Sequence, residues 1–331
     1  MNFSKLISGP LLAYRLINNL NRQKQFLHQH IQPVLDSAME KNDGSLEAGD
    51  IKKITGYYGL AVPAILGEAF CALRGNEMIF KERMASTCQG AMTGLFDDFF
   101  DKQLLTDAAL KAFIDHPEQF NGNTSNEKLF LFFYKTAIDN CNDVGLMKEH
   151  LYKVYHAQVD SKKQGMPGLT GEEIKEITIR KGGASVLFYR TVFTNRMNSE
   201  EEKMLFQLGG LMQLSNDIFD LYKDQQAAIQ TLVTTTKDIK EIRNLFTELL
   251  QQGYAAAYAA GYSKENTRKF IDIVSLGIFS RCFVCLDQLE EKQKSSNNIF
   301  SPSLYTRKDM ICDMDTVSNK WRSLVYHSRH F

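Results

Sequence analysis

Apolar residues recur every three to four positions along almost the whole chain, and strand-like alternation of apolar and polar residues is nearly absent. This spacing places the apolar side chains on one face of an α-helix. We therefore predict an all-α fold. The expected helices, with ends accurate to a few residues, are residues 5–30, 46–56, 58–74, 78–102, 106–115, 125–139, 144–164, 171–196, 200–231, 237–260 and 264–294.

Short loops separate these helices. The pair Asp43-Gly44 and residues 117–125 and 165–171 have the composition of turns. Asn198, which stands before three glutamates, is typical of a helix N-cap with acidic residues in its first turn. The connections therefore favour neighbouring helices that run antiparallel.

No internal repeat, low-complexity tract or long linker divides the 331 residues. We therefore predict a single domain over residues 1–331, an antiparallel helical bundle with its core at about 50–294. A polar stretch at 295–303 separates a C-terminal segment, residues 301–331. This segment is either a cap that closes over a site or a simple surface helix.

The balance of 39 basic and 39 acidic residues argues against nucleic acid as a partner, because phosphate binding needs a basic surface. Cys282 and Cys285 form a C-x-x-C inside an apolar helical run, which favours core packing over redox or zinc chemistry. No signal peptide is evident, and the longest apolar stretch is broken by Pro63 and Glu68. We expect a cytoplasmic protein with no integral membrane span.

The first acidic motif is Gly94-Leu-Phe-Asp97-Asp98-Phe-Phe-Asp101. Asp97 and Asp101 are four residues apart, so both carboxylates project from one face of a helix with Asp98 alongside. The preceding turns are apolar, which indicates an inward-facing helix. A cluster of oxygen ligands there predicts a hard cation, Mg²⁺ in particular when a substrate phosphate completes its coordination.

The second acidic motif is Gly209-Gly-Leu-Met-Gln-Leu-Ser-Asn216-Asp-Ile-Phe-Asp220-Leu-Tyr-Lys-Asp224. Asn216, Asp220 and Asp224 recur every four residues and predict one stripe of three oxygen donors along a helix. An acidic stripe is more often a solvated helix face. Two such stripes, each after an apolar segment, favour metal binding.

Lys181 lies between the motifs and is followed by Gly182-Gly183-Ala-Ser. A lysine beside small residues can bring its ammonium to a phosphate where the backbone approaches closely. The alternative is a surface lysine beside a flexible glycine pair.

Together these residues resemble the trans-isoprenyl diphosphate synthase and class I terpene synthase superfamily. The shared features are D-D-F-F-D at Asp97, then Lys181, then G-x-x-x-Q-x-x-N-D-x-x-D ending at Asp220, in the family's order. Asn216 stands where chain-elongating enzymes have an aspartate, and it makes the motif similar to the N-D-x-x-S-x-x-x-E triad of terpene synthases. The resemblance covers roughly residues 50–290.

The resemblance implies a helical bundle with a central active-site cavity, and it implies roles for these residues. Three Mg²⁺ ions would bind with the substrate diphosphate, two at Asp97 and Asp101 and the third at Asn216, Asp220 and Asp224, with Asp98 also catalytic. The implied substrate-binding residues are Lys181 and Arg190 for the diphosphate, Gln213, and Phe96, Phe188 and Tyr189, whose faces can stabilise a carbocation. For most aromatic residues, core packing is the more common role.

The chain also departs from the chain-elongating enzymes. Where they carry Lys and Arg to hold isopentenyl diphosphate, this sequence has Tyr57, Tyr58 and Ala61, and no Arg-Arg-Gly follows Asp101. A second diphosphate is difficult to hold without those cations. The pattern favours a terpene synthase that acts on one allylic substrate (geranyl, farnesyl, geranylgeranyl or longer diphosphate), with a homodimer as a compatible assembly. The alternatives are an (E)-prenyl diphosphate synthase, a head-to-head condensing enzyme and a non-catalytic isoprenoid-diphosphate-binding paralogue.

Overall fold

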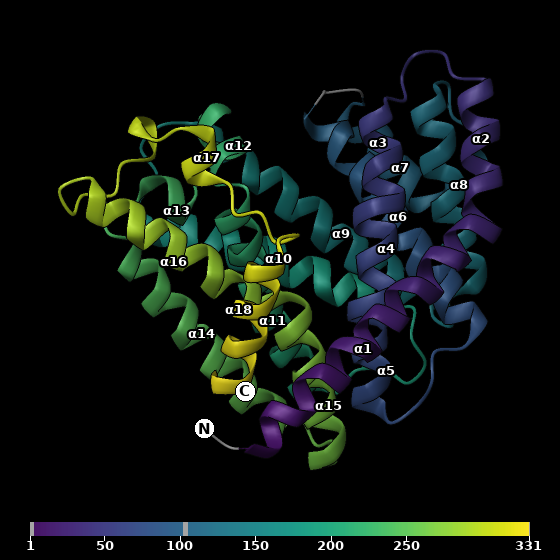
Figure 1. The fold of residues 1–331 in the computed structure, drawn as a ribbon. Helices are drawn as coiled ribbons and strands as arrows, with labels where there is room; N and C mark the ends of the chain where they lie inside the picture. The colour runs from purple at the N-terminus through teal and green to yellow at the C-terminus, as the bar shows by residue number, and fades with distance from the viewer. Residues whose placement is uncertain (1–2, 102–104, 331) are drawn as a thin grey trace. The chain divides into compact units, whose positions relative to one another are not determined.

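The computed structural model describes residues 3–101 and 105–330 (Figure 1). Every regular element in this part of the chain is a helix, and no strand occurs in it. The predicted all-α fold is confirmed. The helices belong to two units that alternate along the sequence, and each unit is described separately.

The N-terminal unit consists of Tyr14–Tyr155 and Phe188–Arg196. The C-terminal unit consists of the segment that ends at Ala13, then His156–Leu187, and the chain from Met197 onward. Both units exceed the size at which a chain can bury its own core. The expectation of one domain over residues 1–331 stays a prediction.

The α-helices up to residue 161 are α1 (Phe3–Phe26), α2 (Gln32–Glu40), α3 (Ala48–Lys52), α4 (Tyr58–Ala61), α5 (Glu68–Arg74), α6 (Phe80–Asp101), α7 (Asp107–Asp115), α8 (Ser125–Asn140) and α9 (Val144–Ser161). The later ones are α10 (Gly171–Arg190), α11 (Ser199–Phe219), α12 (Leu221–Gln226), α13 (Leu232–Thr235), α14 (Ile239–Ala259), α15 (Lys264–Val274), α16 (Ser280–Ser295), α17 (Arg307–Met310) and α18 (Val317–His330). Asn198 begins α11 as predicted, because its side chain accepts hydrogen bonds from the N–H groups of Glu200 and Glu201 at 3.0 and 2.8 Å.

Residues 48–74 form one helical run, although the periodicity predicts two helices. Two π-helical turns, Lys53–Tyr57 and Val62–Gly67, lie within it. The second contains Pro63, and a wider turn accommodates a residue that has no N–H to donate. By length and composition this run can cross a membrane, yet 61% of its apolar window is buried inside the protein, as in a core helix.

In the N-terminal unit, α6 packs along α8 (Figure 1). Phe96 of α6 stacks on Phe130 of α8 at 5.8 Å between ring centroids, and Phe99 meets the same ring edge-on at 5.1 Å. On another side α6 crosses α4 closely: a Cβ on Gly90 would lie 2.4 Å from the carbonyl oxygen of Tyr58. The first acidic motif is therefore carried by a helix enclosed by its neighbours.

In the C-terminal unit, α11 packs against α14 and α16, and α18 packs against α16. Arg322 and Tyr326 of α18 both donate hydrogen bonds to Asp287 of α16, at 2.7 and 2.6 Å. Cys282 and Cys285 of α16 are free thiols and fully buried, which agrees with their interpretation as core residues. The C-terminal segment is thus attached to α16 by specific polar contacts.

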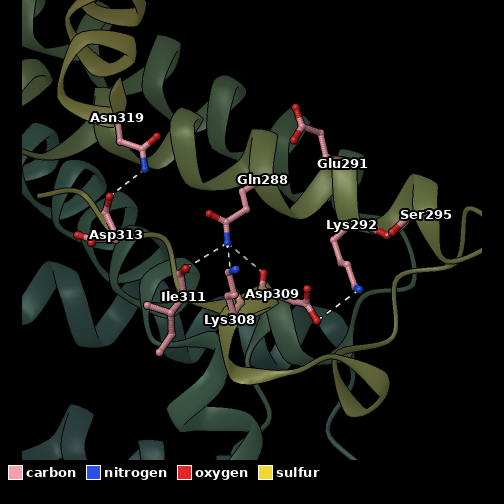
Figure 2. A pocket seen from close by; sticks show the side chains of 9 residues that line it. All are labelled: Gln288, Glu291, Lys292, Ser295, Lys308, Asp309, Ile311, Asp313 and Asn319. Carbon is pink, nitrogen blue, oxygen red and sulfur yellow. Dashed lines mark hydrogen bonds and ion pairs between the residues drawn. The ribbon is translucent and has the colours of Figure 1, made fainter. Parts of the chain in front are cut away.

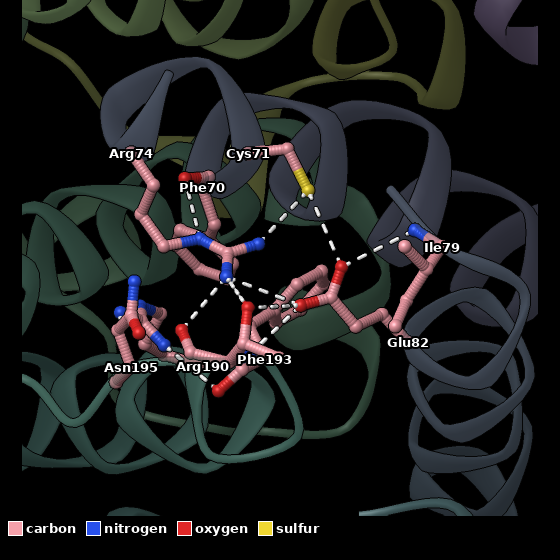
Figure 3. A network of polar contacts seen from close by, with 9 residues as sticks. Phe70, Cys71, Arg74, Ile79, Glu82, Arg190, Phe193 and Asn195 are labelled. Atoms are coloured by element: carbon pink, nitrogen blue, oxygen red, sulfur yellow. Dashed lines mark hydrogen bonds and ion pairs between the residues drawn. The ribbon is translucent and has the colours of Figure 1, made fainter. Parts of the chain in front are cut away.

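A buried polar network ties α5 and α6 to the turn after α10 (Figure 3). The Glu82 carboxylate accepts a hydrogen bond from Arg74 at 3.1 Å and two from Thr194, from its N–H at 2.8 Å and its hydroxyl at 2.9 Å. Burial opposes ionisation of Glu82, but these hydrogen bonds hold its pKa below the usual value. Both members of the ion pair therefore stay charged inside the unit.

We expect Glu82→Gln to lower the free energy of unfolding by about 3–5 kcal/mol, because it leaves the buried Arg74 guanidinium without its counter-charge. Urea unfolding followed by circular dichroism measures this change. The control is Glu200→Gln, which removes an exposed pair with Lys203 and should change stability by about 1 kcal/mol or less. Equal effects of the two substitutions would show that the Glu82 network does not stabilise the fold.

Candidate functional site

The first acidic motif forms the last turns of α6. The apolar turns before the motif hold this helix inside the N-terminal unit. Asp98 is buried and Asp97 is half-buried. Asp101 is the last residue of the helix, and its side chain lies outside the described residues. The common face of Asp97 and Asp101 therefore stays a prediction, and the neighbouring Asp97 and Asp98 differ in burial.

Asp98 has a cationic partner that sequence reasoning missed. The Nζ atom of Lys53 lies 2.9 Å from an Asp98 carboxylate oxygen and 3.6 Å from Asp50. Burial lowers the pKa of Lys53, but the hydrogen bond to Asp98 and the charges of Asp98, Asp50 and Asp97 raise it above its usual value overall. Because Lys53 precedes Asp98 by 45 residues, no local pattern could have indicated the pair.

A line of polar side chains on α6 leads to Asp97. Gln89 donates a hydrogen bond to the Phe188 carbonyl oxygen at 2.8 Å, and one turn later the Thr93 hydroxyl lies 2.9 Å from the hydroxyl of Tyr189. Burial, and to a lesser extent the negative charge of Asp97, raise the pKa of Tyr189. The residues that follow Leu187 are thereby fixed against the helix of the first motif.

The predicted aromatic residues are all buried in the N-terminal unit. Phe96 contacts Phe130 and Phe100, and the rings of Phe188 and Tyr189 contact one another at 5.9 Å. These contacts show a packing role. A role in cation stabilisation stays a prediction.

Arg190 is buried, and its guanidinium donates hydrogen bonds to the carbonyl oxygens of Phe193 and Asn195, at 3.4 and 3.0 Å (Figure 3). It therefore stabilises the turn at the end of α10. Its predicted contact with a diphosphate stays a prediction.

The second acidic motif spans the end of α11 and the short helix α12 in the C-terminal unit. The periodicity predicts one helix over residues 200–231, but the α-helical conformation is interrupted at Asp220, whose φ and ψ are −88° and 7°. The backbone hydrogen bonds from Asp220 to Asn216 and from Asp224 to Asp220 are nevertheless kept, at 2.8 and 2.9 Å. The motif therefore retains helical spacing across the interruption.

Asp217 is the residue of this motif that sequence reasoning missed. Asp217 and Asp224 are only 4% and 8% exposed, whereas Asn216 points to solvent and donates a hydrogen bond to Asp220 at 3.3 Å. Positions four, seven and eleven residues after Gln213 share one helix face, so Gln213, Asp217, Asp220 and Asp224 form the inward stripe. The aspartate after Asn216 was visible in the sequence, and its spacing from Gln213 and Asp224 was the available signal.

The carboxylates of the second motif repel one another. Burial raises the pKa of Asp217 to about 6, although hydrogen bonds from Gln213 at 2.9 Å and Thr178 at 3.4 Å act to lower it. Burial, and then the negative charges of Asp217 and Asp220, raise the pKa of Asp224 to about 7. The Lys181 ammonium lowers both pKa values but does not offset the increase.

Lys181 is positioned by a close crossing of α10 and α11. A Cβ on Gly182 would lie 2.0 Å from the Gly209 carbonyl oxygen, and one on Gly209 would lie 2.5 Å from that of Gly182. A Cβ on Gly183 would come similarly close to the ring of Phe206, and one on Gly210 would come similarly close to Ile179. The glycines after Lys181 thus allow two helix backbones to touch, which brings the lysine beside the second motif.

Within residues 3–101 and 105–330, no three His, Cys, Asp or Glu side chains lie close enough to hold a metal ion unaided. Mg²⁺ is usually held by one or two carboxylates together with substrate phosphates and water. Asp217, Asp220 and Asp224 supply only oxygen, and their mutual repulsion would be relieved by a divalent cation. The donor set of the second motif therefore fits Mg²⁺.

We expect the metal-free protein to be destabilised by Asp224 as the pH rises. The pKa of Asp224 is higher in the folded state than its usual value of 3.8, so the folded protein holds a proton that the unfolded chain has lost. The penalty is absent below about pH 4, grows between about pH 4 and 7, and is complete above about pH 7. In urea unfolding with EDTA at pH 8, the free energy of unfolding of Asp224→Asn should exceed that of the parent by about 2 kcal/mol. At pH 4 the two should be equally stable. Asp315→Asn, at an almost fully exposed carboxylate, should show no such dependence.

A cavity of about 640 Å³ lies elsewhere in the C-terminal unit, between α16 and the C-terminal segment (Figure 2). Its lining mixes charges of both signs, and Lys292 pairs with Asp309 at 3.3 Å. Gln288 donates hydrogen bonds to the carbonyl oxygens of Asp309 and Ile311, both at 3.1 Å. None of the predicted site residues lines this cavity.

The C-terminal segment brings one cation to the second motif. The Arg307 guanidinium of α17 lies over the ring of Tyr222, at 5.8 Å from its centroid, and Tyr222 stands between Asp220 and Asp224 in α12. This contact is compatible with the predicted cap, and the capping role stays a prediction.

No model of a known protein family matches the chain, and no curated protein matches it. Among solved structures, the chain is similar to one described as a crystal structure of a dehydrosqualene synthase in complex with ligand. The two share 13% sequence identity, with a TM-score of 0.46 over 96% of this chain and 97% of the other.

Proposed function

We propose that this protein is a Mg²⁺-dependent class I terpene synthase, which converts an allylic prenyl diphosphate into a terpene and inorganic diphosphate. The carrying observation is the repulsion among Asp217, Asp220 and Asp224, whose burial and charge raise the pKa of Asp217 and Asp224. Such repulsion does not stabilise a fold, and perturbed carboxylates of this kind cluster at functional sites. A divalent cation with a diphosphate would complete the set.

The residues of the chain would act as follows. Asp217, Asp220 and Asp224 would hold Mg²⁺ together with the substrate diphosphate, and Gln213 would fix the orientation of Asp217 through its hydrogen bond. Lys181 would add a positive charge for the diphosphate. In the first motif, Asp97 and Asp101 would hold further Mg²⁺, while Lys53 pairs with the buried Asp98. Asn216 would add its side-chain oxygen as a metal ligand from the solvent side, where it contacts Asp220.

Bound Mg²⁺ supplies Lewis-acid stabilisation of the negative charge that develops on the leaving diphosphate. The allylic C–O bond breaks, and its electron pair leaves with the diphosphate. The resulting carbocation then loses a proton or captures water, and buried aromatic rings would shield it from solvent before that. The ionisation needs no nucleophile from the protein.

The charge of the α4 region favours a terpene synthase over a chain-elongating enzyme. Tyr57, Tyr58 and Ala61 supply no cation, and the ammonium of Lys53 is engaged by Asp98 and Asp50. Chain elongation must hold a second diphosphate beside the allylic substrate, because a bimolecular step gains much of its rate from positioning. The prenyl diphosphate synthase remains the second candidate.

The decisive experiment supplies each allylic diphosphate of about ten to twenty carbons with Mg²⁺ and radiolabelled isopentenyl diphosphate. We expect release of inorganic diphosphate and a hydrocarbon or terpene alcohol, with no label in the solvent extract after phosphatase treatment. Label in a longer prenol would replace the proposal with chain elongation. A product with twice the carbon number of the substrate, seen by mass spectrometry, would replace it with head-to-head condensation.

A further inference from the structure

Helix α1 combines an exposed apolar strip with an unusual charge distribution. Leu11, Tyr14 and Ile17 recur on successive turns of α1 and are 54%, 61% and 54% exposed. Adjacent exposed apolar side chains, unlike single scattered ones, can mark a surface that binds a protein or a membrane. We call these three residues the α1 strip.

The sequence around the strip is basic in a chain whose net charge is zero. The first 35 residues contain Lys5, Arg15, Arg22 and Lys24, and the first acidic residue of the chain is Asp36. Arg15 and Lys24 are exposed, and Arg15 adjoins Tyr14. A helix with apolar residues and basic neighbours on its exposed side is typical of a segment that lies in the interface of an anionic bilayer.

We propose that the α1 strip docks on the surface of an anionic phospholipid bilayer. The strip would enter the headgroup region, and Arg15 and Lys24 would face the lipid phosphates. A second copy of the chain fits this surface less well, because a two-fold contact across α1 would bring two basic helices together. The docking does not depend on the proposed enzymatic activity.

The test uses the full chain and vesicles of phosphatidylcholine with an equal amount of phosphatidylglycerol, compared with vesicles of phosphatidylcholine alone. We expect the protein to cosediment with the anionic vesicles and not with the neutral ones. Binding should weaken by about fivefold for each basic residue neutralised near the surface, as in Arg15→Gln, and should fall at high salt.

A matched pair of variants isolates the strip. Tyr14→Glu should lower partitioning to anionic vesicles by roughly tenfold or more. Tyr258→Glu, at a tyrosine that is 53% exposed on α14, should leave it within about twofold. Leu11→Glu provides a second variant, and circular dichroism confirms that each is folded.

Three results would overturn the proposal. The first is no binding to anionic vesicles, and the second is equal binding to neutral and anionic vesicles. The third is a dimer in analytical ultracentrifugation that Tyr14→Glu dissociates while vesicle binding is unchanged, which would assign the strip to a contact between copies of this chain.

Discussion

Replacing Asp220 with asparagine should lower Mg²⁺-dependent release of diphosphate from the best allylic substrate by roughly 10²- to 10³-fold. The negative charge of Asp220 acts on Asp224 and Asp217, and an amide cannot contribute that charge to a divalent cation. EDTA should abolish turnover of the parent enzyme. Asp97→Asn tests the first motif separately and should produce a loss of similar size. The measurement is the initial rate of diphosphate release with geranyl, farnesyl and geranylgeranyl diphosphates.

The control for this series is Asp315→Asn, which removes an exposed carboxylate outside both motifs and should leave the rate unchanged. Circular dichroism should show that all variants keep their helical content. Turnover that persists in EDTA would contradict metal dependence. A fully active Asp220→Asn variant would remove the second motif from the catalytic machinery.

Replacing Gly182 with alanine should destabilise the protein by about 3 kcal/mol, because the new Cβ would lie 2.0 Å from the Gly209 carbonyl oxygen. The obstacle is backbone, so the two helices must separate. The apparent melting temperature should fall by about 6–12 °C. The variant should also lose affinity for inorganic diphosphate with Mg²⁺, because separation moves Lys181 away from Asp217.

The sign of the effect makes this prediction specific. Replacing an ordinary helical glycine with alanine stabilises the protein, since alanine has the higher helix propensity. Gly171→Ala is the control, because nothing lies within 4 Å of a Cβ there, and we expect no loss of stability. If Gly182→Ala were as stable as Gly171→Ala, α10 and α11 would not cross as closely as described. Differential scanning calorimetry and calorimetric titration measure the two readouts.

Local sequence patterns were enough to predict the helices and several of their ends. A repeat of three to four residues reflects the geometry of one helix, so it indicates α6 and α11 without knowledge of their neighbours. The N-cap at Asn198 was also predictable, because a cap is made by residues adjacent in sequence. The same reasoning gave too long a helix at 200–231, since no local signal marks the interruption at Asp220.

The orientation of the acidic residues was predictable only in part. The stripe Asn216, Asp220 and Asp224 has correct helical spacing, yet the buried face is that of Asp217 and Asp224. Both stripes satisfy the periodicity of a helix, and the packing of α11 against α10 decides between them. Burial then determines which carboxyl groups have raised pKa values.

Residue types and their order along the chain therefore establish an all-α protein with two acidic motifs and a lysine between them. Contacts between distant residues had to come from the folded chain. Lys53 meets Asp98 across 45 residues, and Gly182 meets Gly209 where two helix backbones touch. The physical reason is that a helix repeats a local conformation, whereas an ion pair or a helix crossing depends on how whole elements pack, which no short stretch of sequence encodes.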